Sequence, residues 1–517
     1  MSNQKLAIPS FIYSFFSFVS RLSGYIRDLV LASFIGTSAI SDIFLIALKL
    51  PNSFRQSLSD ETFNSAFIPI FGRIKEVEGG KQAINFTANI LMLFLIFFSI
   101  VVLFVEIYMA EILYVFSSNI GDGHNFDLLV YVSRVIFPYL IVLAVSAIIL
   151  GNLNAHNKFA LSGAFPSLLN FVLVLAISSF GYFNGDKIIY LAYSVVIGGI
   201  FQLVVLIFNL KRDYWVSLFK INLNPLKIKE FFSLYFPVLL ASTFFQINIM
   251  TGVLISSFEE GAVSYIYYAE RLFYLPISIV GAAIGIVLVP NLSESIRNKD
   301  RETALGYLSA ANKYALIIIL PASAFLLSLS SEIVSFLFER GEFGENSSRN
   351  TTLALNTFLI GLPAVTLVKI FTPYFFAIEQ PKIYLRAAFY SNCMNLILMI
   401  VLFNIYGFIG IPIAYSLSAY ALLFIIIYEQ KKIGFFIYNF KESLQVIKYS
   451  LMAASIFVVC NLSKDITSTF FIGDLISIVI SGVSSVIIFL IFIFLFEKNI
   501  LNSIRKVFID KFFHKPG

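Results

Sequence analysis

The feature that most constrains this chain is a series of long apolar stretches that are almost free of charge. Examples run from Ile90 to Val105 and from Ile476 to Phe496. A bilayer is crossed by a helix of about twenty such residues, and the sequence predicts about fourteen of these spans. The expected spans are residues 8–34, 38–58, 84–108, 128–151, 160–181, 187–209, 231–256, 262–289, 310–331, 351–376, 385–405, 409–430, 445–463 and 472–496. Because only 13% of the 517 residues are charged and the mean hydropathy is +0.88, a soluble fold is excluded. The predicted fold class is an all-α polytopic membrane protein.

The first apolar stretch, from Leu6 to Val19, has the length of a signal-peptide core. No small-residue cleavage pattern follows it; Ser20-Arg21 and Arg27-Asp28, which contain charged residues, come next instead. We therefore expect this stretch to be retained as the first membrane helix.

The connections between the expected spans alternate between basic and acidic composition. One set contains most of the basic loop residues, which are Arg73, Lys75, Lys81, Lys211, Arg212, Lys220, Lys227, Lys229, Arg297, Lys299, Arg301, Lys431, Lys432 and Lys441, with Lys498, Arg505, Lys506, Lys511 and Lys515 in the C-terminal tail. The opposite loops hold mainly acids and amides, as in Glu259-Glu260. Since loops rich in Lys and Arg stay in the cytoplasm, both termini are predicted to be cytoplasmic.

Prolines, glycines and asparagines recur at an offset of 225 residues, as in Gly36 and Gly261, Pro51 and Pro276, Pro138 and Pro363, and Asn170 and Asn395. The proline and asparagine pairs fall in corresponding expected helices and the glycine pair falls in corresponding connections, which favours an internal duplication. Habitual placement of prolines near helix ends is the alternative explanation. Because the offset spans an even number of helices, the two copies would share one orientation and enclose a substrate cavity. We expect an N-terminal lobe at 1–225 and a C-terminal lobe at 226–440, each with six helices in pseudo-two-fold symmetry. Two further helices and a cytoplasmic tail would occupy 441–517.

Charged residues are concentrated in three of the expected membrane helices. The first helix contains Arg21, Arg27 and Asp28, the second contains Asp42, Lys49 and Arg55, and the eighth contains Glu270 and Arg271. A charge at mid-membrane costs about 2.5–3.5 kcal/mol even on permissive scales, so such groups pair with one another or line water. Guanidinium groups bind phosphate and carboxylate through paired hydrogen bonds. The pattern therefore predicts a cationic cavity for an anionic substrate that carries phosphates.

Less specific interpretations of these residues stay open. Arg21 and Lys49 could lie near helix ends, with side chains reaching the interface. Arg27 with Asp28, or Glu270 with Arg271, could form structural ion pairs, and Gly24 would permit a bend or a close helix approach. Lys369 and Glu379, around the tenth span, are weaker candidates for a cavity or gate.

The sequence offers little for other kinds of chemistry. It contains no Walker loop, nucleophile elbow or HExxH motif, so no catalytic residue is predicted. Cys393 and Cys460 lie in apolar runs, the three histidines are scattered, and no metal or cofactor site is expected. The basic residues form no single patch, which argues against nucleic acid. Coupling to an ion or to the membrane potential is left open.

Five segments resemble the MurJ/MviN family: "SRLSGYIRD" (Ser20 to Asp28), "SDIFLIALKLPNSFRQ" (Ser41 to Gln56), "FNSAFIPIF" (Phe63 to Phe71), "YYAERL" (Tyr267 to Leu272) and "LFERGEF" (Leu337 to Phe343). The resemblance runs from the first helix to about the twelfth. It implies two six-helix lobes, as in multidrug and oligosaccharidyl-lipid exporters, and two additional C-terminal helices that the MurJ/MviN family adds to them.

The resemblance also implies a function. The family transports lipid II, an undecaprenyl-pyrophosphate-linked disaccharide pentapeptide, from the inner to the outer leaflet of the bacterial cytoplasmic membrane. Arg21, Arg27, Arg55 and Arg271 match positions that bind substrate, whereas Asp28, Asp42, Lys49, Asn52 and Glu270 are assigned to the cavity or gate. Membrane lipids and proteins of cell-wall synthesis are further candidate partners.

Three departures from the family pattern affect this assignment. Asp60-Glu61 stands where Glu-Gly is common, Glu270 replaces the usual Asp, and Ser23 replaces an apolar residue.

The alternative functions are a related exporter of another polyprenyl-linked saccharide or of drugs. A membrane-embedded enzyme would need an acidic residue on an external loop, where Glu342 and Glu345 lie.

Overall fold

The computed structural model describes residues 2–57, 60–114, 123–156, 158–182, 185–209, 225–283, 287–435, 437, 440–469 and 473–497. Throughout these ranges the chain is helical and contains no β-strand. The basic residues predicted at Lys211, Arg212, Lys220 and in the tail from Lys498 onward lie outside the described residues, as do the side chains of Asp60, Glu61 and Lys441.

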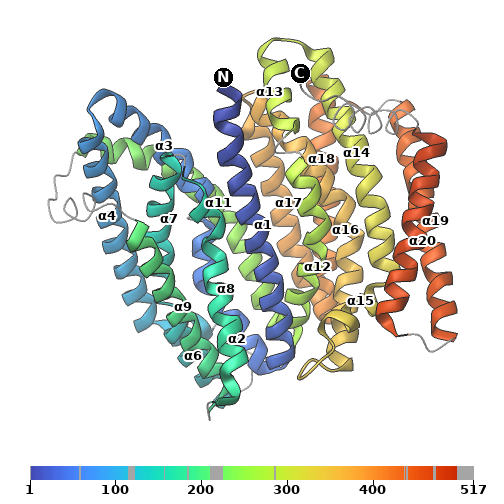
Figure 1. Cartoon of the computed structure of the whole chain (residues 1–517), viewed down its shortest axis with the longest axis horizontal. Helices are drawn as coiled ribbons and strands as arrows, with labels where there is room; N and C mark the ends of the chain where they lie inside the picture. Colours follow the sequence, from blue (N-terminus) through green and yellow to red (C-terminus); the bar gives the residue numbers. More distant parts are fainter. Residues whose placement is uncertain are drawn as a thin grey trace, which may run out of the picture. The chain divides into compact units, whose positions relative to one another are not determined.

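The chain divides into two compact units (Figure 1). The first comprises residues Met1–Tyr265 and Arg340–Ser347, and the second comprises Ile266–Glu339 and Ser348–Gly517. The helices up to the start of the second unit are α1 (Ser2–Ile35), α2 (Ala39–Ser57), α3 (Asp60–Val77), α4 (Gly80–Ile107), α5 (Met109–Tyr114), α6 (His124–Ile136), α7 (Tyr139–Ala155), α8 (Ala160–Ser179), α9 (Lys187–Asn209) and α11 (Pro225–Ser256).

The remaining helices are α12 (Ala262–Ala283), α13 (Val289–Arg297), α14 (Arg301–Ser328), α15 (Ser330–Phe338), α16 (Glu345–Ala377), α17 (Pro381–Tyr406), α18 (Gly410–Lys432), α19 (Phe440–Thr469) and α20 (Asp474–Phe496). Each expected span coincides with a helix of this series, the fourth being shared by α6 and α7. The predicted fold class is confirmed.

Ten segments of the described chain are long and apolar enough to cross a membrane, and one of them, Pro381–Lys432, contains both α17 and α18. Helices α1, α2 and α12 are not among these ten. They are the three helices in which the sequence concentrates its charges. Because unpaired charge is costly in hydrocarbon, these three helices need partners or water along one face.

The helix order repeats along the chain. The helix α4 begins at Gly80 and its counterpart α14 at Arg301, while α8 begins at Ala160 and its counterpart α17 at Pro381. These steps fall within a few residues of the 225-residue offset between Gly36 and Gly261. The short helices α3 and α13 also hold corresponding places, each after the second long helix of its half. The succession of helices thus supports duplication over a chance recurrence of prolines.

Aromatic side chains fill the interior of the first unit, where α3, α4 and α11 meet. Phe63 and Phe67 stack with ring centroids 4.9 Å apart, and Phe231 lies 5.6 Å from Phe63. All three side chains are fully buried. These rings hold α3 within the unit, although α3 is not among the ten segments that are long and apolar enough to cross a membrane.

Helices α19 and α20 of the second unit pack side by side through small polar side chains (Figure 1). Hydroxyl pairs join them at successive turns: Ser463 with Ser481 at 2.8 Å, and Thr467 with Ser477 at 2.9 Å. Cys460 is buried against Ser485, with Sγ and Oγ 3.0 Å apart. Small residues permit close helix approach, and hydroxyl pairs stabilise helix association in a bilayer.

The carboxylate of Glu497, just after α20, connects this helix pair to α14. It accepts hydrogen bonds from Lys313 Nζ at 2.5 Å, from Lys448 Nζ, and from Tyr449 Oη at 2.6 Å. Burial favours the protonated form, but the two ammonium groups and the hydroxyl outweigh it and lower the pKa of Glu497 to about 2. The α19–α20 pair is therefore fixed to α14 of the second unit by an ionised carboxylate that two lysines and a tyrosine hydroxyl share.

Candidate functional site

The first-helix arginine that the sequence singles out, Arg27, is held in a buried ion pair. Its Nε and Nη2 donate to Asp28 Oδ1 at 2.9 and 2.6 Å, and its Nη1 donates to Asn170 Oδ1 of α8 at 2.9 Å. The side chains of Arg27 and Asp28 are 14% and 2% exposed. Of the interpretations left open by the sequence, a paired Arg27 and Asp28 is the one seen in this structure.

Asn170 organises the neighbouring turns of α1 as well. Its Nδ2 donates to Ser23 Oγ at 3.0 Å and approaches the Ser20 carbonyl at 3.5 Å. A Cβ on Gly24 would lie 3.4 Å from the same nitrogen, so Gly24 allows α8 to approach closely. The serine that departs from the family pattern at position 23 thus supplies a hydrogen-bond partner. Sequence reasoning noted Asn170 only as the repeat partner of Asn395, and that recurrence was the signal for a structural role.

The other predicted cations of the first unit are more accessible. The side chains of Arg21 and Arg55 are exposed, and Lys49 is half-buried. Arg55 Nε donates to Asn52 Oδ1 at 3.3 Å, and Asn52 Nδ2 donates to the Leu48 carbonyl at 2.9 Å. Within the described ranges, no hydrogen bond or ion pair engages the guanidinium of Arg21. Arg21 and Arg55 are therefore accessible cations on α1 and α2.

Arg271 and Glu270 lie on α12 in the second unit. The Arg271 guanidinium stacks over the Tyr267 ring, 4.4 Å from its centroid, and its side chain is exposed. Glu270 is half-buried and acts electrostatically on the paired hydroxyls of Tyr274 and Tyr415. Stacking on an aromatic ring fixes the plane of the guanidinium.

Asp42 of α2 is buried, with 3% of its surface exposed, and caps the start of α12. Its Oδ2 accepts the Gly261 amide at 2.7 Å, and its Oδ1 accepts the Ser264 amide at 2.9 Å and the Ser264 hydroxyl at 2.5 Å. The first amides of a helix have no partner within the helix, and a carboxylate there also meets the positive end of the helix dipole. Asp42 thus joins two helices whose sequence positions are more than two hundred residues apart.

The turn between α1 and α2 is enclosed by the segment that contains the "RGEF" motif. Glu342 donates its backbone amide to the Ser33 carbonyl at 3.0 Å. Gly36 and Gly341 both adopt left-handed φ, at 62° and 61°. A Cβ on Gly36 would lie 2.4 Å from the Glu342 carbonyl oxygen, and one on Gly341 would lie 2.2 Å from the Ser33 carbonyl oxygen. Only glycine fits both positions, because the backbones themselves are in contact.

Side chains add to this docking. Lys187 of α9 forms an ion pair with Glu342 at 2.7 Å and donates to the Phe34 carbonyl at 3.2 Å. Thr37 Oγ1 donates to Ser347 Oγ at 2.5 Å. The α1–α2 turn is therefore covered by the loop before α16, and Asp42 nearby binds the start of α12.

No metal-binding arrangement is found in the part of the chain that the structure describes, where no three His, Cys, Asp or Glu side chains are grouped to hold an ion. The site instead consists of membrane helices that carry paired and exposed charges, with helix ends joined by buried hydrogen bonds. Together with the many apolar spans, these features define a polytopic membrane transporter.

Comparison with known proteins identifies the family. A family model described as lipid II flippase MurJ matches residues 31–481. A probable lipid II flippase MurJ of Rhizobium tropici is 30% identical over 420 residues, which is 80% of this chain and 79% of that protein. One from Rickettsia prowazekii is 30% identical over 410 residues, covering 79% of this chain and 80% of that protein.

Solved structures agree on the fold. A lipid II flippase MurJ in an inward closed conformation superposes with a TM-score of 0.80 at 23% identity, covering 95% of this chain and all of that one. An inward-facing multidrug transporter of the MATE family gives 0.69 at 14% identity over 80% of this chain and 94% of that one. The chain belongs to the MurJ family of lipid II flippases. It is a multi-pass membrane transporter and not an enzyme.

Proposed function

We propose that this protein flips lipid II from the cytoplasmic to the outer leaflet of the bacterial cytoplasmic membrane. Its relatives bear the name of lipid II flippases. The observation that carries the proposal is the arginine cluster of α1, in which Arg27 is buried and oriented within a membrane helix by Asp28 and Asn170. Ionisable residues within membrane helices commonly mark a substrate pathway, and this arginine is oriented by two partners at such a depth.

The pyrophosphate of lipid II is the group that these cations would bind. Asp28 and Asn170 hold the Arg27 guanidinium in one orientation, so little side-chain entropy is lost when a phosphate oxygen replaces the carboxylate. Arg21, Arg55 and Arg271 would supply further donors, with Lys49 adding positive charge. Asp28 would neutralise Arg27 in the absence of substrate.

Transport would proceed by alternating access of two lobes, at residues 1–225 and 226–440, followed by α19 and α20. The Asp42 cap and the backbone contacts of Gly36 with Glu342 and of Gly341 with Ser33 would close the external end, since the loops before α12 and α16 are predicted to face outward. Opening that end would require these hydrogen bonds to break. A net charge moving through the membrane potential changes energy by about 2.3 kcal/mol per charge per 100 mV, which would help reset a cationic cavity.

The decisive experiment is flipping of fluorescent lipid II in proteoliposomes, combined with complementation of a bacterium depleted of its own flippase. Arg27→Ala should abolish both activities, whereas Arg27→Lys should retain part of them because the charge is kept without the paired donors. Arg349→Ala, an exposed arginine in the α16 segment, is the matched control and should behave as wild type.

The results separate the candidate functions. Lipid II flipping by wild type and the control, with loss in Arg27→Ala, supports the proposal. Failure of a correctly inserted wild type to flip lipid II would refute it and favour an exporter of another polyprenyl-linked saccharide or of drugs. Accessibility of tags at the two termini would test the predicted cytoplasmic location of both.

A further inference from the structure

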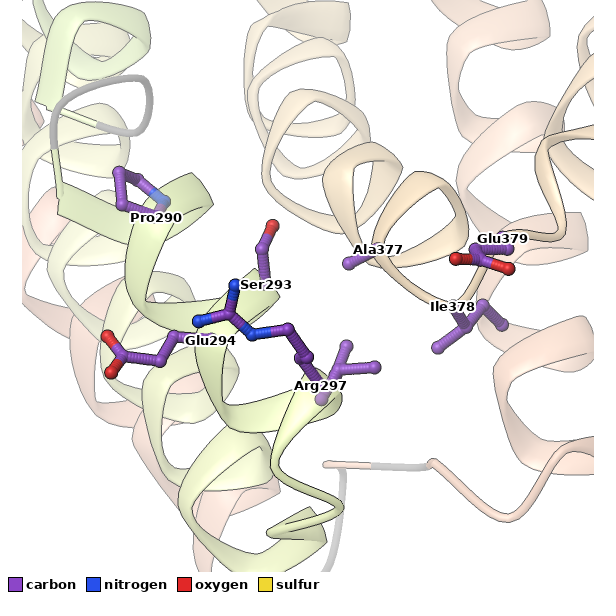
Figure 2. Close-up of a pocket in the computed structure, with 8 residues that line it drawn as sticks. Pro290, Ser293, Glu294, Arg297, Ala377, Ile378 and Glu379 are labelled. Carbon is purple, nitrogen blue, oxygen red and sulfur yellow. The ribbon is translucent and has the colours of Figure 1, made fainter.

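The second unit contains a pocket of about 560 Å³ between α13 and the turn that follows α16. Ser293, Glu294 and Arg297 line it from α13, and Ile378 and Glu379 line it from the turn. Figure 2 shows Ser293 and Arg297 on one wall, with Ala377, Ile378 and Glu379 across from them. This volume lies within the range of small-ligand sites, about 300–1,000 Å³.

The corresponding place in the first half of the repeat is filled. There α3 packs directly on α7: a Cβ on Gly151 would lie 2.8 Å from the Phe63 ring. At the following turns of α3, Phe71 packs against His156 at the end of α7, with the two ring centroids 5.3 Å apart. The pocket is therefore not a by-product of the duplicated fold but a difference between the two copies.

The charged groups of the pocket are available to a ligand. In the described part of the chain, no hydrogen bond or ion pair engages the side chains of Glu294, Arg297 or Glu379, and all three are exposed. Glu379 adopts a left-handed backbone conformation with φ of 59°, which is uncommon for a residue with this side chain. This conformation belongs to the C-terminal cap of α16, where the Glu379 amide donates to the Phe376 carbonyl at 3.0 Å and the Gln380 amide donates to the Phe375 carbonyl at 2.9 Å. The cap places Glu379 among the residues that line the pocket.

The pocket opens at the end of the second unit that is rich in basic residues. Arg301, which starts α14 shortly after α13, donates to the Gly434 carbonyl and stacks on Phe435 beyond the end of α18. Lys431 and Lys432 end α18 on the same side. By the positive-inside rule this end faces the cytoplasm, where lipid II is loaded.

We infer that this pocket binds a zwitterionic part of the substrate's peptide stem, a residue that carries both a free ammonium and a free carboxylate. Arg297 would bind the carboxylate through paired N–H groups. Glu294 and Glu379 would bind the ammonium, Ser293 would donate to or accept from the peptide, and Ile378 would contact its aliphatic chain. This inference rests on the proposed function, because a peptide is the part of lipid II whose side chains can carry both an ammonium and a carboxylate.

The test uses the full-length protein in nanodiscs and soluble pentapeptides as probes. One peptide has a central residue whose side chain ends in both an ammonium and a carboxylate, and the other has alanine at that place. Binding is measured by calorimetry for wild type, Arg297→Gln and Glu379→Gln. Arg386→Gln is the matched control, because Arg386 is an exposed arginine of α17 outside this pocket.

Wild type and the control should bind the zwitterionic peptide at least about tenfold more tightly than the alanine peptide, and each pocket variant should lose about that factor. Equal binding of the two peptides by wild type, or unchanged binding by both pocket variants, would overturn the inference. The lipid II flipping assay separates it from the proposed function. If the protein flips lipid II but binds both peptides equally, only the assignment of this pocket is refuted. If it binds the zwitterionic peptide selectively but does not flip lipid II, only the proposed transport is refuted.

Discussion

The buried cap formed by Asp42 allows a quantitative prediction. The substitution Asp42→Asn keeps the size of the side chain but replaces one carboxylate oxygen by an NH₂ group. Asparagine can still accept from Ser264, but its NH₂ would then point at the Gly261 amide, which is also a donor. The variant therefore loses at least one charge-assisted bond and the favourable interaction with the α12 dipole.

The size of the effect follows from these contacts. A hydrogen bond to a charged group contributes about 1.5–3 kcal/mol, and a charge at a helix terminus contributes about 0.3–1 kcal/mol. A total of about 2–4 kcal/mol corresponds to roughly 30- to 800-fold more frequent detachment of the 261–264 segment. Because the carboxylate is almost completely buried, little of this loss is recovered by water.

Hydrogen–deuterium exchange with mass spectrometry measures this directly in peptides covering residues 259–266. Exchange in these peptides should be roughly 30- to 800-fold faster in Asp42→Asn than in wild type, while exchange in peptides from α8 stays unchanged. Ser264→Ala is the graded control: it removes the hydroxyl but leaves both amides bonded to Asp42, so its effect should be smaller. A folded Asp42→Asn protein with exchange within threefold of wild type would refute the capping argument.

Three other predictions concern stability. Gly341→Ala places an alanine in a left-handed conformation against a carbonyl oxygen and should lower the free energy of unfolding by at least about 1–2 kcal/mol, measured by thermal unfolding. Gly344→Ala is the control, because the space around Gly344 is open, and equal effects of the two substitutions would contradict the docking. Asn170→Ala removes the acceptor of Arg27 Nη1 and should lower the free energy of unfolding by about 1–3 kcal/mol in the same assay. An unchanged unfolding temperature would contradict the stabilising role of Asn170. Ionised Glu497 contributes its full stabilisation of the folded state at pH values above its ordinary pKa of 4.5, and this contribution is lost as the pH falls towards 2. Glu497→Gln should thus lower stability at pH 7 and weaken the acid-induced loss, and an unaltered pH profile would contradict the assignment.

The charged residues of the membrane helices illustrate what sequence reasoning could reach. Their concentration in α1, α2 and α12 was evident from composition, because charges stand out in apolar runs. Their roles were not evident: Arg27 and Asp28 could equally have lined a cavity or paired, and the sequence could not say that Asn170 would complete the cluster. The acceptor lies 143 residues away along the chain.

The sequence by itself determined the membrane spans, the duplication and the family resemblance, since each of these is written in local hydrophobicity or in motifs of a few residues. Tertiary structure alone decided that Asp42 caps α12, that the backbone at Gly36 contacts Glu342 while that at Gly341 contacts Ser33, and that a pocket opens beside α13 whereas α3 packs directly on α7. These features depend on how distant segments pack, and small differences in side-chain volume decide whether such an interface is filled or open.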